Sequence, residues 1–135
     1  MYTYTLEYVQ ELRRKCRKKN MWAPASFWME SGEYLKNCYN GIGPECWSTR
    51  FREWVTKALD RFSTAALIHD YEYSYSAGKC YRNFTAANFR FAINSIAEAW
   101  HSRASIKHKL IMIFSGWFLA FLCQVFGWKA YEDGK

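Results

Sequence analysis

The chain has 135 residues, of which 19 are Lys or Arg and 12 are Asp or Glu, giving a formal net charge of +7. Half of the residues are hydrophobic, a fifth are aromatic, and only two are Pro and seven Gly, which excludes a disordered tail, a collagen-like repeat and a flexible linker. The length fits one domain of ordinary size with its own core. The basic excess favours an anionic membrane or a polyanion as partner, and no motif for specific nucleic-acid recognition accompanies it.

The first 20 residues contain six basic residues against only two acids, Glu7 and Glu11. Leu6, Val9 and Leu12 recur at helical spacing, so residues 3–19 are predicted to form an N-terminal basic helix that Thr3 or Thr5 caps. The basic cluster follows the first apolar residues instead of preceding them, so we expect no secretory signal peptide. The compartment stays open, and the composition favours a membrane-associated protein.

The middle of the chain predicts helices and no strands. Residues 20–47 contain both prolines and three glycines and are expected to be irregular. Apolar residues then recur at helical spacing over residues 47–59, from residue 63 or 64 to about 77, and over 85–107. The sequence therefore predicts an all-α fold: a small helical domain with a two-helix core carrying His69 and Asp70.

Residues 110–128 form an uncharged segment of predominantly apolar residues between Lys109 and Lys129. As a helix this segment would be about 28 Å long, close to the ~30 Å hydrocarbon core of a bilayer. It is interpreted as a transmembrane helix, a buried helix or a protein–protein contact. The expected organisation is a helical domain over residues 1–109, this hydrophobic helix over 110–128, and a polar tail over 129–135.

Two motifs contain residue types suited to hydrolytic chemistry. His69 and Asp70 are adjacent on a predicted helix, where neighbouring side chains point about 100° apart and can serve one site from two sides. An imidazole can activate water as a general base, and a carboxylate can hold a hard cation such as calcium. Upstream, Gly41 and Gly43 alternate after Tyr39, which allows turns that direct several backbone carbonyls inward.

Together the motifs resemble the phospholipase A2 superfamily, which has a Tyr-x-Gly-x-Gly calcium loop followed by a helix bearing Cys-Cys-x-x-His-Asp-x-Cys-Tyr. The chain is most similar to the reduced, phage-encoded form, with an Asn-Gly-x-Gly-Pro-x-x-Trp loop before an Ala-x-x-His-Asp-x-x-Tyr helix. The resemblance covers roughly residues 37–100, and its matching segments are Tyr39-Asn40-Gly41-Ile42-Gly43-Pro44-Glu45-Cys46-Trp47 and Ala66-Leu67-Ile68-His69-Asp70-Tyr71-Glu72-Tyr73.

The resemblance implies a role for each matching residue. His69 would be the general base that activates water against an ester carbonyl. Asp70, with backbone carbonyls near Tyr39, Gly41 and Gly43, would hold calcium, which would stabilise the oxyanion. Tyr73 would help orient a carboxylate on the second helix, and that carboxylate would hold the tautomer of His69.

The chain departs from the family pattern at four positions. Ala65, Ala66 and Glu72 stand where the family has cysteines, which fits a protein that packs without disulfides. Asn88 stands where the phage relatives have Asp; it can accept a hydrogen bond from the imidazole but cannot stabilise the imidazolium by charge.

Two hypotheses follow from these motifs and departures. The first is a calcium-dependent hydrolase of phospholipid esters at a membrane. The second is a catalytically impaired phage structural or accessory protein that uses the same scaffold and residues 110–128 for membrane contact, virion assembly or self-assembly.

Overall fold

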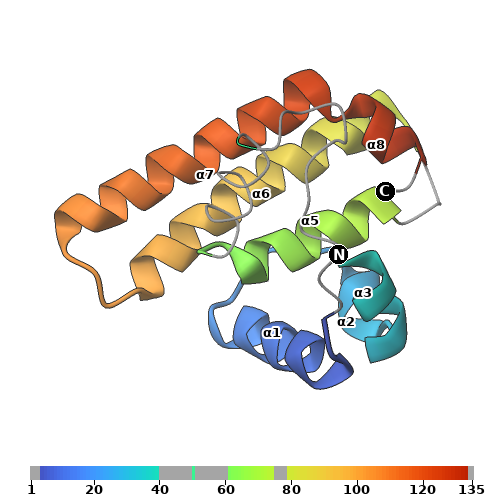
Figure 1. Cartoon of the computed structure of the whole chain (residues 1–135), viewed down its shortest axis with the longest axis horizontal. Coiled ribbons are helices and arrows are strands. Elements are labelled where there is room, and N and C mark those ends of the chain that lie inside the picture. Colours follow the sequence, from blue (N-terminus) through green and yellow to red (C-terminus); the bar gives the residue numbers. More distant parts are fainter. Residues whose placement is uncertain (1–3, 40–49, 51–60, 75–78, 134–135) are drawn as a thin grey trace.

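The computed structural model describes residues 4–39, 50, 61–74 and 79–133. Over these ranges the regular structure is entirely helical, which confirms the predicted all-α fold (Figure 1). Two sequence predictions lie outside the described residues: the helix over 47–59, apart from Arg50, and the glycines of the predicted calcium loop. The helices, with the labels of Figure 1, are α1 (Leu6–Lys18), α2 (Ala25–Met29), α3 (Gly32–Cys38), α5 (Ser63–Ser74), α6 (Tyr81–His101), α7 (Ile106–Phe126) and α8 (Trp128–Asp133).

The basic helix predicted at the N-terminus is α1. Thr5 caps it, because its hydroxyl accepts a hydrogen bond from the backbone N–H of Tyr8 at 3.1 Å. Val9, Leu12 and Cys16 are buried on the face that packs on α5, while the basic residues crowd the last turn. That placement complements the negative end of the helix dipole.

The prediction that residues 20–47 are irregular is wrong for α2 and α3. Pro24 precedes α2 with its φ fixed near the helical value, and the Ser31 hydroxyl caps α3 by accepting from the N–H of Tyr34. Both helices are too short to be stable alone. Burial stabilises them, since Phe27 and Leu35 are completely inaccessible in the core.

The boundaries around α6 to α8 also differ from the prediction. The periodic pattern over 85–107 divides between two helices, because Ser105 caps α7 by accepting from the N–H of His108. The segment predicted as a polar tail from residue 129 belongs largely to α8. Its Tyr131 is buried against the rings of Tyr73 and Phe84, with centroids 5.3 and 5.4 Å away.

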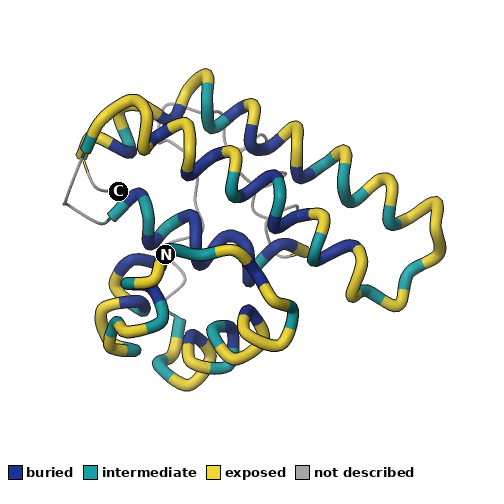
Figure 2. The backbone as a smooth tube through the Cα atoms, turned by 180° about the vertical axis from the view of Figure 1, so that it is seen from behind, coloured by how far each residue is buried: buried dark blue, intermediate teal, exposed yellow. Residues whose placement is uncertain are grey.

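The long helices α6 and α7 lie side by side as an antiparallel hairpin, and α5 packs against α6 (Figure 1). On its other sides α5 contacts α1 and α3 as well as the short α8. Figure 2 shows buried positions throughout most of α5, whereas α7 alternates between buried and exposed positions along its length. The hairpin therefore has one face toward the core and one face toward solvent, and α5 is the centre of the molecule.

Candidate active site

His69 lies in the last half of α5, a helix in which eight of twelve residues are buried. The small side chains of Ala65 and Ala66 allow neighbouring helices to approach this segment closely. The imidazole is only 8% exposed and lies between aromatic rings, with centroid distances of 4.1 Å to Tyr73 and 5.3 Å to Phe91. His69 is therefore a core histidine, and a polar group on the neighbouring helix contacts its ring.

That polar group is the amide of Asn88 on α6. The Asn88 Oδ1 atom lies 2.8 Å from Nε2 of His69 and accepts a second hydrogen bond from the Tyr73 hydroxyl at 2.7 Å. An amide oxygen only accepts hydrogen bonds, so Nε2 of His69 carries the ring proton in this arrangement. Nδ1 is left as the basic nitrogen. The structure thus brings together three of the predicted site residues.

Gln124 of α7 completes this network, and the sequence interpretation did not identify it. Its Oε1 accepts from Nδ2 of Asn88 at 2.8 Å, while its Nε2 donates to the hydroxyl oxygens of Tyr81 and Thr85 at 3.1 and 2.9 Å. These contacts fix which end of the Asn88 amide faces the imidazole. The sequence did contain a signal for Gln124, because it is the single amide in the uncharged segment 110–128. An amide in such a segment needs a hydrogen-bond partner when other helices cover it. We define the neutral cluster as His69, Tyr73, Asn88 and Gln124.

Burial dominates the acid–base properties of the neutral cluster. It lowers the pKa of His69 to about 4, and the hydrogen bond with Asn88 opposes this shift only in part. Burial likewise raises the pKa of Tyr73 above its ordinary value. At neutral pH the imidazole is uncharged, so it can accept a proton. The site offers no negative charge on α6 to stabilise the imidazolium that would result.

Asp70 lies beside the imidazole but is not directly hydrogen-bonded to it. Its Oδ1 is 4.0 Å from Nδ1 of His69, which is beyond hydrogen-bond range. Asp70 also lies near Cys38, the last residue of α3, because its negative charge affects the pKa of that thiol. Burial is the main cause that raises the pKa of Cys38, a hydrogen bond with Ser74 lowers it, and the charge of Asp70 raises it. The chain therefore enters the predicted calcium loop close to this carboxylate.

The described residues supply only part of the predicted calcium site. Tyr39 is buried, with its ring 4.5 Å from that of Tyr4, and Gly41 and Gly43 lie outside the described residues. Within the described ranges, no group of three or more His, Cys, Asp or Glu side chains is arranged to hold a metal. A calcium ion would thus depend on Asp70 and on backbone carbonyls, a donor set that suits a hard cation.

Glu72, which the sequence resemblance aligns with a cysteine, forms an ion pair with Arg90 of α6. The guanidinium of Arg90 also lies over the ring of Trp22, 4.6 Å from its centroid. Beside this pair is a cavity of about 230 Å³ that Tyr71 and Tyr131 help to line. The pair links α5 to α6, which is a structural role.

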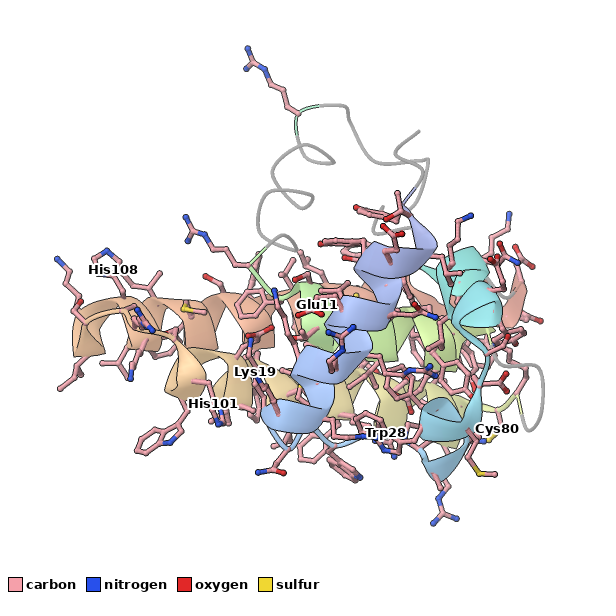
Figure 3. All side chains as sticks on the ribbon, turned by 90° about the horizontal axis from the view of Figure 1, so that it is seen from below. Glu11, Lys19, Trp28, Cys80, His101 and His108 are labelled. Carbon is pink, nitrogen blue, oxygen red and sulfur yellow. The ribbon has the colours of Figure 1, made fainter. Side chains whose placement is uncertain are left out.

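The other histidines are remote from α5. His101 ends α6 and His108 lies in the first turn of α7, and Figure 3 shows both at one end of the molecule, with Cys80 at the opposite end. Both are exposed. They belong to the basic tip of the hairpin, as expected for a solvated surface.

No family model matches the chain, and neither the curated proteins nor the solved structures provide a significant match to it.

Proposed function

We propose that the chain is a phage-type, phospholipase A2-like hydrolase in which His69 activates water for attack on a phospholipid ester. The observation that supports this proposal is the hydrogen bond between Nε2 of His69 and Oδ1 of Asn88. It joins the two helices that the sequence resemblance pairs, and it leaves Nδ1 available as the base. Tyr73 donates to the same amide oxygen, as expected for a residue that orients the partner of the histidine.

In this mechanism Nδ1 of His69 removes a proton from water as the oxygen attacks the ester carbonyl. Asn88 holds the ring in the required tautomer, and Tyr73 and Gln124 hold Asn88. Asp70 and carbonyls near Tyr39, Gly41 and Gly43 would hold a calcium ion, which when bound supplies positive charge for the oxyanion. The imidazolium then returns its proton to the leaving alcohol.

The neutral amide limits the rate of this mechanism. An amide beside a catalytic histidine cannot stabilise the imidazolium by charge, even when it holds the required tautomer as Asn88 does, so the transition state loses electrostatic stabilisation. A His69 pKa of about 4 acts in the same direction, because the buried imidazole holds a proton poorly. We therefore expect slow hydrolysis by the natural chain and faster hydrolysis by Asn88→Asp.

A mixed-micelle assay of fatty-acid release, with calcium and with chelator, tests the proposal on the natural chain and two variants. His69→Gln removes the base while its amide can still donate to Asn88, so release should stop. Asn88→Asp should increase release by at least about tenfold, because each ~1.36 kcal/mol by which the new charge stabilises the transition state raises the rate about tenfold. Fatty-acid release that persists in His69→Gln, or that chelator does not reduce, would contradict the proposal of a calcium-dependent hydrolase that uses His69 as its base.

The second candidate is a catalytically impaired phage structural or accessory protein that keeps the helical scaffold. The specific observation in its favour is that His69, Tyr73 and Asn88 are buried and that the neutral cluster is hydrogen-bonded without any charge. Such a cluster stabilises a fold whether or not it reacts. A folded Asn88→Asp variant that releases no fatty acid in calcium would favour this candidate, in which α7 serves membrane or virion assembly.

A further inference from the structure

The side of α7 that points away from α6 is almost entirely apolar and exposed. We define this outer face by residues that recur at helical spacing and lie in solvent, namely Leu110, Ile111, Phe114, Trp117, Phe118, Phe121 and Val125. Phe114 is 74% and Phe121 61% exposed. Contiguous aromatic exposure of this kind marks an interaction surface.

The outer face continues onto α6 through ring contacts. Trp117 meets Phe89 edge-to-face with centroids 6.4 Å apart, and Phe89 meets Trp22 in the same way at 6.4 Å. All three rings are exposed by more than a third of their surface. The apolar surface therefore follows the hairpin and is not confined to one helix.

The opposite side of α7 is attached to the helical body. A Cβ added at Gly116 would lie 2.3 Å from the Cβ of Ser95, so only glycine allows the two helices to approach this closely. Two residues before the helix ends, Gln124 joins the neutral cluster through Asn88. By length and composition alone α7 is long and apolar enough to cross a membrane. Spanning as a separate helix, however, would break both contacts, and spanning together with α6 would place polar groups of α6 in lipid.

Charge at the ends of the outer face selects its partner. Residues 99–131 contain four basic residues and no acid, and the exposed acids Glu132 and Asp133 follow at the end of α8. Arg103 and Lys107 are exposed near the start of α7, and Lys129 is exposed just after its end. Near the start, Lys109 also lies over the ring of exposed Trp100, 5.8 Å from its centroid. Basic residues and tryptophans that bracket an apolar helix face are typical of proteins that lie in the interface of an anionic bilayer.

We propose that the outer face of α7 docks the folded protein flat on an anionic phospholipid surface. The aromatic side chains enter the headgroup region, and the lysines at both ends contact lipid phosphates. This inference extends the proposed function, since it assigns the surface through which the folded protein would meet phospholipid. Its test measures binding instead of hydrolysis, so the two can fail separately.

The test is co-sedimentation of the full chain with vesicles of phosphatidylcholine, with and without phosphatidylglycerol. The variant Phe114→Asp/Phe121→Asp places two charges on the outer face, where both residues are exposed and the fold should tolerate them. Met29→Asp is the matched control, because Met29 is 87% exposed on α2, which lies far from α7 (Figure 1). Circular dichroism verifies that each variant is folded.

The natural chain and Met29→Asp should bind the anionic vesicles and be released by alkaline carbonate. The double variant should bind at least about tenfold more weakly, because two aromatic side chains no longer enter the headgroup region and two carboxylates face anionic lipid. Equal binding of the double variant would overturn the proposal. So would resistance to carbonate, which indicates a spanning helix. A third result would also overturn it: the natural chain does not bind vesicles but associates with itself, and the double variant does not self-associate. That result would assign the outer face to a second copy of the chain.

Discussion

Two largely buried polar clusters join α5 to α6, and they differ in charge. The neutral cluster contains an amide on α6, at Asn88. The second, which we name the charged cluster, consists of Thr64 on α5, Glu98 on α6 and Lys19 at the end of α1. Thr64 donates to one carboxylate oxygen of Glu98, and the ammonium of Lys19 donates to the other at 2.5 Å. Glu98 is only 6% exposed.

The difference shows what the fold requires of a carboxylate on α6. Glu98 can remain buried because α1 brings a cation to it, whereas the partners of Asn88 are a neutral histidine, a tyrosine and a glutamine. An aspartate at position 88 would be buried without a countercharge and would cost several kcal/mol. Asn88 thus satisfies the same hydrogen bonds and favours folding, at the expense of the charge that a catalytic histidine needs.

The largest expected effect comes from breaking the charged cluster. Lys19→Met leaves the carboxylate of Glu98 buried and unpaired, so the free energy of unfolding should fall by about 3 kcal/mol in urea denaturation. Lys18→Met is the matched control, because Lys18 is an exposed neighbour on α1, and it should change stability by less than about 0.5 kcal/mol.

Adding Glu98→Gln to Lys19→Met should restore part of the lost stability, because the double variant no longer buries a charge. Equal stability of the Lys19 and Lys18 variants would show that the ion pair contributes nothing. In that case the carboxylate of Glu98 would not depend on a cation for its burial, and the comparison with Asn88 would fail.

The next effect is the pH dependence of the neutral cluster. The pKa of His69 is about 4 in the folded protein against 6.5 for a free histidine, so the unfolded chain binds more protons between these values. The stability due to neutral His69 is fully present above pH 6.5 and declines as pH falls toward 4, by up to about 3 kcal/mol. Urea denaturation of the natural chain and His69→Gln across this range isolates this contribution. Parallel curves for the two proteins would contradict the burial of a neutral imidazole.

The sequence predicted the parts of this comparison that depend on local pattern. Helical spacing identified α1 and α5, and the motif spacing selected His69, Tyr73 and Asn88. The partners from distant segments could not be predicted, because no local pattern relates Lys19 to Glu98 or Gln124 to Asn88 across 79 and 36 residues. The short α2 and α3 were missed for the same reason, since tertiary burial of Phe27 and Leu35 stabilises them more than their own propensity.

The smallest expected effect concerns the orientation of Asn88. Gln124→Leu removes the acceptor for Nδ2 of Asn88, and stability should fall by about 1 kcal/mol. Without that acceptor the Asn88 amide can rotate, so ¹⁵N NMR of His69 should show less of the tautomer protonated at Nε2. Gln124→Glu is the matched variant, because its carboxylate still accepts from Nδ2 while the hydroxyls of Tyr81 and Thr85 can donate to it. The Glu variant should keep the natural tautomer. An unchanged tautomer in the Leu variant would mean that Tyr73 alone orients the amide, and that α7 contributes packing but no control to the site.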